Sequence, residues 1–138
     1  MASGIHKAAS RIPRSIEENE ILEKELAQAR ILAALGHEVY LLPERGPRKV
    51  KHPDAVVDGL IMEFKTITGN IRKIKENYKE ARKKADNVFL KIDSDFTPEQ
   101  VLRTLFGTVR RGNYSGGLII AYFTGLKKIY YWNTVDII

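Results

Sequence analysis

Hydrophobic residues recur along the chain at spacings typical of amphipathic helices and of strands with one buried face. Ser15 with Glu18, and Thr97 with Gln100, have the spacing of capping boxes and mark two helix starts. Helices are predicted over 15–35, 70–85 and 97–111, and strands over 38–42, 54–57, 60–66, 87–92, 116–123 and 127–132. This order, α-β-β-β-α-β-α-β-β, predicts an α/β fold in which helices flank a mixed sheet.

The dipeptide Asp58-Gly59 lies between two short apolar runs, which is a strong signal for a type I′ β-hairpin. A two-residue turn at this point places Asp54 directly opposite Glu63. One face of the hairpin is then apolar throughout and is expected in the core: Ala55, Val57, Leu60, Met62 and Phe64. The other face carries Asp54, Val56, Ile61, Glu63 and Lys65.

Two carboxylates are thereby expected with their Cβ atoms about 5 Å apart. Because like charges repel, we expect a cation between them, a raised pKa on one of them, or a shift of register. Their hard oxygen atoms favour a divalent metal, Mg²⁺ or Mn²⁺, with Zn²⁺ as a further candidate. Lys65 lies two residues beyond Glu63 on the same face, next to that metal. The structural alternative is a solvated strand face on which Glu and Lys alternate.

A third carboxylate comes from the first predicted helix. Glu25 lies three residues after Leu22 and seven before Leu32, so it projects from the apolar stripe. Glutamate is rarely buried without a partner, although a residue at the edge of a stripe can also reach water. Glu18 lies on the same face and is the second choice, since its capping role already explains it; Glu23 is expected to face water.

Composition narrows the classes of function. The 138 residues fit one domain over 15–138, preceded by a flexible leader or linker over 1–14. The absence of Cys excludes disulfides, cysteine zinc sites and thiol catalysis, and no apolar run is long enough to span a membrane. The net charge of +6 favours a polyanionic partner.

Much of that charge is expected in the helix over 70–85, where the carboxylates are Glu76 and Glu80. Its start follows Lys65 closely, so we expect a nucleic-acid backbone to bind there. The alternative is a solvated helix with ordinary Glu–Lys pairs. The predicted nucleic-acid contacts are Thr66, Thr68, Asn70, Lys73, Lys75 and Lys79, with Arg48 and Lys49 from a basic loop.

A helix glutamate, then Pro53-Asp54, then Glu63-Phe64-Lys65 within α-β-β-β-α-β resembles the PD-(D/E)XK nuclease superfamily. Other segments resemble the C-terminal tRNase toxin domain of CdiA, from contact-dependent growth inhibition systems: 25–33, 36–44, 53–55, 63–66, 87–92 and 129–132. The resemblance covers about residue 20 to the end. It implies a PD-(D/E)XK-like α-β-β-β-α-β core with an added C-terminal helix and strand pair. It implies Glu25, Asp54, Glu63 and Lys65 as the catalytic residues, with the three carboxylates holding the metal.

The resemblance also implies a function: a metal-dependent phosphodiester hydrolase that cleaves RNA, foremost tRNA, as a toxin in inter-bacterial competition. It implies a cognate immunity protein, action in the cytoplasm of a target bacterial cell, and production as the C-terminal part of a larger exported surface protein. A DNase of the same superfamily is an alternative, because the catalytic residues do not contact the 2′-hydroxyl. A basic nucleic-acid-binding module with structural carboxylates is the non-enzymatic alternative. A metal-independent RNase using His52, Lys65 and Glu63 is the rival mechanism.

Overall fold

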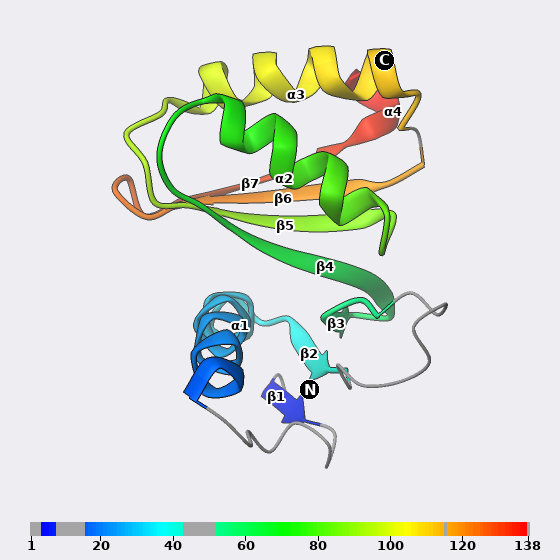
Figure 1. Cartoon of the computed structure of the whole chain (residues 1–138). Helices are drawn as coiled ribbons and strands as arrows, with labels where there is room; N and C mark the ends of the chain where they lie inside the picture. The colour runs from blue at the N-terminus through cyan, green and yellow to red at the C-terminus, as the bar shows by residue number, and fades with distance from the viewer. Residues whose placement is uncertain (1–3, 8–15, 43–51, 115, 138) are drawn as a thin grey trace. The chain divides into compact units, whose positions relative to one another are not determined.

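The computed structural model describes residues 4–7, 16–42, 52–114 and 116–137 (Figure 1). Helices are interspersed among the strands along the chain, and the strands are hydrogen-bonded in the order β1-β2-β3-β4-β5-β6-β7. This confirms the predicted mixed sheet with flanking helices. The chain forms two compact units, Met1–Met62 and Glu63–Ile138, and β4 (Leu60–Ile67) runs through the boundary between them. A single domain over 15–138 stays a prediction.

In its described residues, the first unit consists of β1 (Gly4–Lys7), α1 (Ile16–Ala34), β2 (Glu38–Leu41), β3 (Ala55–Val57) and the start of β4. β1 is parallel to β2, whereas β2 with β3 and β3 with β4 are antiparallel. Leu22, Ala29 and Leu32 of the predicted α1 stripe are buried. The predicted start of this helix at Ser15 lies outside the described residues.

Two expectations for this unit need correction. Gly4–Lys7 form β1, although 1–14 were expected as a leader; four residues show no readable periodicity, and pairing with β2 is what makes them a strand. Leu60 was expected in the core, yet it is 43% exposed. It directly follows the turn at the tip of the hairpin, where its pleat position does not secure burial.

The second unit adds α2 (Arg72–Arg82), β5 (Asn87–Ile92), α3 (Pro98–Gly112), β6 (Leu118–Phe123), β7 (Lys128–Asn133) and α4 (Thr134–Ile137). β5 and β6 are parallel, so their connection must cross over, and α3 is that crossover. α2 and α3 cover the same face of the strands (Figure 1). They bury Ile74, Tyr78 and Leu105 in a core with β5 and β6.

The helix boundaries differ slightly from those predicted. α2 begins at Arg72, not at 70, because Gly69 has a left-handed backbone (φ 88°) and the Asn70 side chain accepts the backbone N–H of Arg72 at 3.0 Å. α3 begins at the predicted capping box. Among the described residues, no helix is long and apolar enough to cross a membrane.

Candidate functional site

The predicted hairpin is present with the predicted register. Asp58 and Gly59 have φ of 48° and 86°, as a type I′ turn requires, and Ala55 pairs with Met62. Asp54 therefore directly precedes Ala55 in the chain, and Glu63 directly follows its partner Met62. Asp54 is half-buried and belongs to the first unit.

Glu63 is a buried carboxylate with two lysines beside it. Its side chain is 2% exposed, and its Oε2 lies 3.4 Å from the Lys84 Nζ and 4.0 Å from the Lys65 Nζ. All three residues belong to the second unit. A carboxylate shielded from water is stable only where cations or hydrogen-bond donors replace that water, and the two ammonium groups do so here. The predicted neighbours Glu63 and Lys65 are thus brought together.

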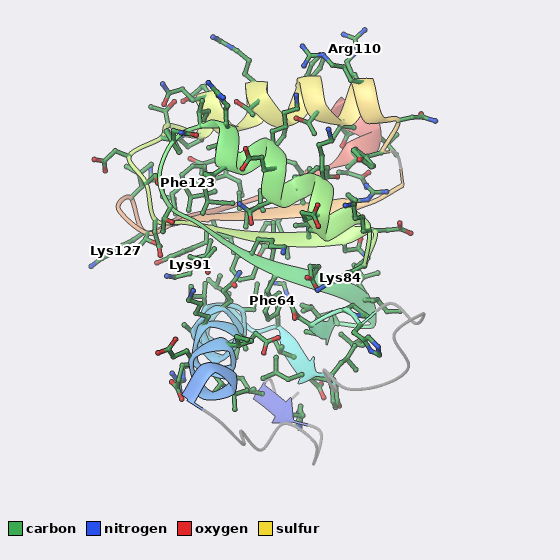
Figure 2. The ribbon with its side chains drawn as sticks, viewed as in Figure 1. Phe64, Lys84, Lys91, Arg110, Phe123 and Lys127 are labelled. Atoms are coloured by element: carbon green, nitrogen blue, oxygen red, sulfur yellow. The ribbon has the colours of Figure 1, made fainter. Side chains whose placement is uncertain are left out.

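Lys84 lies beside Glu63 in the candidate site, although no sequence pattern indicated it. It was read as one more cation of the basic helix, but it lies just beyond the end of α2 and reaches back to β4 (Figure 2). A helix that crosses from one strand to the next runs back along the first strand, so its end returns to that strand's beginning. The number of residues between Glu63 and the end of the helix could therefore have indicated that Lys84 returns to Glu63.

The end of α2 holds a further concentration of charge. The Lys83 ammonium donates to Glu80 at 2.8 Å and is the main cause that lowers the pKa of the Glu80 carboxyl; Lys65 and Lys84 lower it further. Glu80 in turn raises the pKa of Lys83. Both side chains are more than half exposed, so their pairing is a surface interaction, unlike that of Glu63.

Glu25 is buried, at 5% exposure, among the apolar residues of α1 in the first unit, as its spacing predicted. Glu23 is exposed, also as predicted. The side chain of Glu18 lies outside the described residues, so its rank as second choice stays a prediction.

The residues predicted to contact nucleic acid differ from one another in exposure. Lys73, Lys75 and Lys79 are exposed on α2, and Lys73 pairs with Glu76 at 3.4 Å. Thr68 is exposed and Thr66 is half-buried, while the Asn70 side chain accepts the Arg72 N–H at the start of α2. Arg48 and Lys49 lie outside the described residues.

A metal would have to be held by carboxylate oxygens. Within the described residues, no three His, Asp or Glu side chains form a group that could hold an ion. Mg²⁺ needs no such group, since it is usually held by one or two carboxylates together with waters and substrate phosphates. A carboxylate such as that of Glu63 has the donor chemistry that this mode of binding uses.

Of the histidines, His37 has a partner at the hairpin turn. His37 Nδ1 lies 2.6 Å from Asp58 Oδ2, and the Glu38 backbone N–H donates to Asp58 Oδ1 at 2.8 Å. The His37 hydrogen bond is the main cause that lowers the pKa of the Asp58 carboxyl. His37 therefore stabilises the hairpin turn through its hydrogen bond with Asp58. His52 is half-buried, and its place in a metal-independent mechanism stays a prediction.

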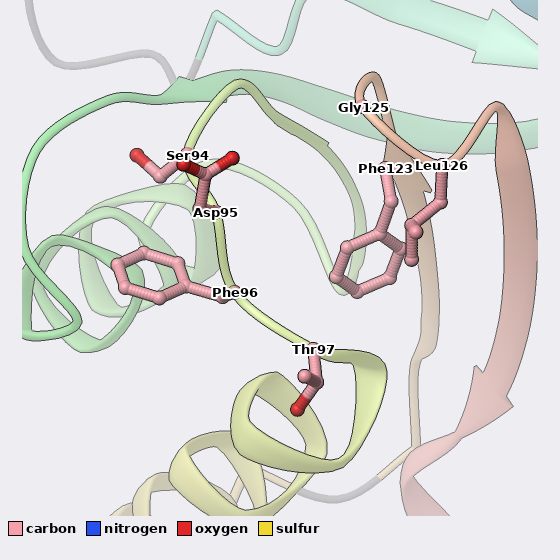
Figure 3. Close-up of a pocket in the computed structure, with 7 residues that line it drawn as sticks. All are labelled: Ser94, Asp95, Phe96, Thr97, Phe123, Gly125 and Leu126. Atoms are coloured by element: carbon pink, nitrogen blue, oxygen red, sulfur yellow. The ribbon is translucent and has the colours of Figure 1, made fainter.

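A pocket of about 260 Å³ lies where β5 and β6 end (Figure 3). Its lining includes Phe96, Phe123 and Leu126. The hydroxyl of Thr97, at one side of the pocket, accepts the backbone N–H of Gln100 and so serves the α3 cap. The lining is mixed, because Ser94 and Asp95 add a hydroxyl and a carboxylate to the three apolar side chains, and no sequence pattern indicated this pocket.

Two comparisons with known proteins found similarity to a CdiA C-terminal domain. The family model of the contact-dependent growth inhibition CdiA C-terminal domain matches residues 51–106. A solved structure, the CdiA-CT/CdiI toxin and immunity complex from Burkholderia pseudomallei, contains a chain with the same fold: TM-score 0.66, 23% sequence identity, 94% of this chain and 98% of that chain covered. No curated protein sequence matches this chain significantly.

Proposed function

We propose that this chain is the toxic nuclease domain of a contact-dependent growth inhibition protein, and that it hydrolyses RNA, foremost tRNA, with a divalent metal. The observation that carries the proposal is the buried Glu63 with Lys65 and Lys84 beside it. A carboxylate and a lysine two residues apart on one strand suit phosphodiester hydrolysis, which needs a metal ligand and a cation near the same phosphate. The family match over 51–106 includes these residues.

In this proposal Asp54 and Glu63, which flank the paired residues Ala55 and Met62, hold Mg²⁺ or Mn²⁺, with Glu25 as a third carboxylate. The bound metal supplies a water of lowered pKa and neutralises charge on the phosphate. Lys65 orients the attacking water and stabilises the scissile phosphate. Lys84, whose Nζ lies 3.4 Å from the Glu63 Oε2, positions that carboxylate.

The biological setting follows from the same likenesses. The similar chain from Burkholderia pseudomallei was solved as a toxin with its immunity protein. We therefore propose a cognate immunity protein for this chain too. We also propose that the domain is the C-terminal part of a larger surface protein and acts in the cytoplasm of the target bacterium.

The test is a cleavage assay with total RNA and with plasmid DNA, each with Mg²⁺ or with EDTA. We expect RNA cleavage that needs Mg²⁺ and falls at least about 100-fold in Lys65→Ala and Asp54→Asn, since each removes a group acting on the transition state. Glu25→Gln should also lose activity, with the exposed Glu23→Gln as its matched control. Thermal unfolding of each variant shows whether the fold is kept.

Each other result decides between functions. Cleavage of plasmid alone would make the chain a DNase, and cleavage in EDTA would exclude the metal mechanism. Nucleic-acid binding without cleavage in any condition would leave the non-catalytic module. Wild-type turnover in Lys65→Ala would remove that residue from the catalytic site.

A further inference from the structure

The outer face of α3 carries an exposed aromatic residue among arginines. The inner face of the helix is accounted for by the core, where Val101, Leu105 and Val109 are buried. Phe106 is 40% exposed on the other side. Arg103 and Arg110, one turn on either side of it, are also exposed, as is Arg111, which lies further round the helix. We call these four residues the α3 arginine face.

One of the arginines, Arg110, is held against an aromatic ring of the helix, and Arg111 lies near the helix surface. The Arg110 guanidinium lies over the Phe106 ring, 5.1 Å from its centroid, a cation–π contact. The Arg111 guanidinium lies across Gly107, with Nη2 3.7 Å from where a Cβ would stand. Side chains already ordered in this way lose less entropy when a ligand binds. Figure 2 shows Arg110 on the outer side of α3.

The charge of this face is not compensated locally. The first turn of α3 contains one carboxylate, Glu99, and no ion pair with Arg103, Arg110 or Arg111 occurs in the described part of the chain. The adjacent α2 packs against α3 on the same face of the strands and exposes Lys75 and Lys79. A polyanion can thus contact both helices.

We propose that the α3 arginine face binds an unpaired segment of the RNA substrate. A nucleobase stacks on the Phe106–Arg110 pair, because an exposed ring with a guanidinium beside it offers a flat, sequence-tolerant platform. Arg103 and Arg111 contact the neighbouring phosphates. This rests on the proposed function, and it names the state of the substrate: single-stranded at α3.

The test measures binding without cleavage, by fluorescence anisotropy of the full chain in EDTA. The probes are a short labelled single-stranded RNA and a blunt RNA duplex of the same length. Phe106→Ala should weaken single-strand binding by about 5-fold or more and leave duplex binding unchanged, since paired bases offer no free face for stacking. Phe106→Tyr should bind like the wild type.

Arg103→Ala should weaken binding to both probes and reduce the slope of log affinity against log salt by about 0.7 for the single strand, the loss of one phosphate contact. Arg30→Ala, an exposed arginine of α1, is the matched control and should bind like the wild type.

Single-strand binding by Phe106→Ala within about twofold of the wild type would overturn the proposal, as would an equal loss in Arg30→Ala. Unchanged RNA binding together with weaker neutralisation by the immunity protein would also overturn it and assign this face to that partner. The cleavage assay distinguishes a failure of this inference from a failure of the proposed function. If the wild type cleaves RNA and the α3 variants cleave and bind it equally well, this inference alone is overturned. If the chain binds RNA but does not cleave it, only the proposed function is overturned.

Discussion

Asp58 illustrates how much a single residue can contribute to a small hairpin. Its backbone is left-handed, which Asp tolerates better than most residues, and its carboxylate accepts the Glu38 N–H while it also bonds with His37. The sequence predicted the turn from local chemistry alone. It did not predict His37 as the brace, because the two residues meet only when β2 and β3 pair.

The contribution of Asp58 should depend on pH. Its pKa in the folded chain is lowered below the ordinary 3.8, so the ionised carboxylate stabilises the fold above that value, and this stabilisation is lost as the pH falls through the folded pKa. We expect the free energy of unfolding of the wild type to fall more steeply below about pH 4 than that of Asp58→Asn, which keeps the turn and the Oδ1 acceptor. Urea unfolding at several pH values measures this; parallel curves would contradict it.

At the scale of the element, the start of α3 was the most readable feature of the sequence. Thr97 and Gln100 form the predicted capping box, with the Gln100 N–H donating to the Thr97 hydroxyl at 3.2 Å and the Thr97 N–H donating to the Gln100 side chain at 2.9 Å. A cap depends on residues three positions apart, so the chain carries the whole signal locally.

Thr97→Ala should lower the free energy of unfolding by about 1 kcal/mol, because an N–H at the start of α3 loses its acceptor. Thr97→Ser keeps the hydroxyl and should cost much less. Chemical denaturation of the three proteins compares them, and equal losses in Ala and Ser would show that the methyl group, not the cap, is what counts.

The crossover from β4 through α2 to β5 creates a contact that no local pattern reveals. Glu63 and Lys84 lie 21 residues apart in sequence and meet at 3.4 Å. Glu80 and Lys83 form a shorter pair, 2.8 Å, but both side chains are more than half exposed. Water and salt screen the second pair much more than the first.

We therefore expect Glu63 and Lys84 to be coupled more strongly than the shorter pair. A double-mutant cycle with Glu63→Gln and Lys84→Met should give a coupling energy of about 1 kcal/mol or more. The same cycle for Glu80 and Lys83, with Gln and Met, should give less than about 0.5 kcal/mol. A larger coupling for the exposed pair would show that distance, not burial, governs these contacts.

At the scale of the whole molecule, part of the net charge of +6 is concentrated on two helices. In the described residues the outer faces of α2 and α3 expose Lys75, Lys79, Arg103, Arg110 and Arg111, and both helices lie on one side of the strands in the second unit. The sequence indicated α2 by its run of basic residues. It did not indicate α3, whose arginines are spaced among apolar residues and gather on one face only when the inner positions are buried.

The sequence by itself determined the features whose information is local: the order of helices and strands from α1 to β7, the type I′ turn, the hairpin register, the capping box, and the burial of Glu25 in the stripe of α1. Periodicity and short-range hydrogen bonding encode these within a few residues. Only the tertiary structure decided that Gly4–Lys7 form a strand, that His37 braces the turn, that Lys84 reaches Glu63, and that Phe106 lies exposed among arginines. Each of these depends on pairing or packing between residues distant in sequence, which chain order alone does not specify.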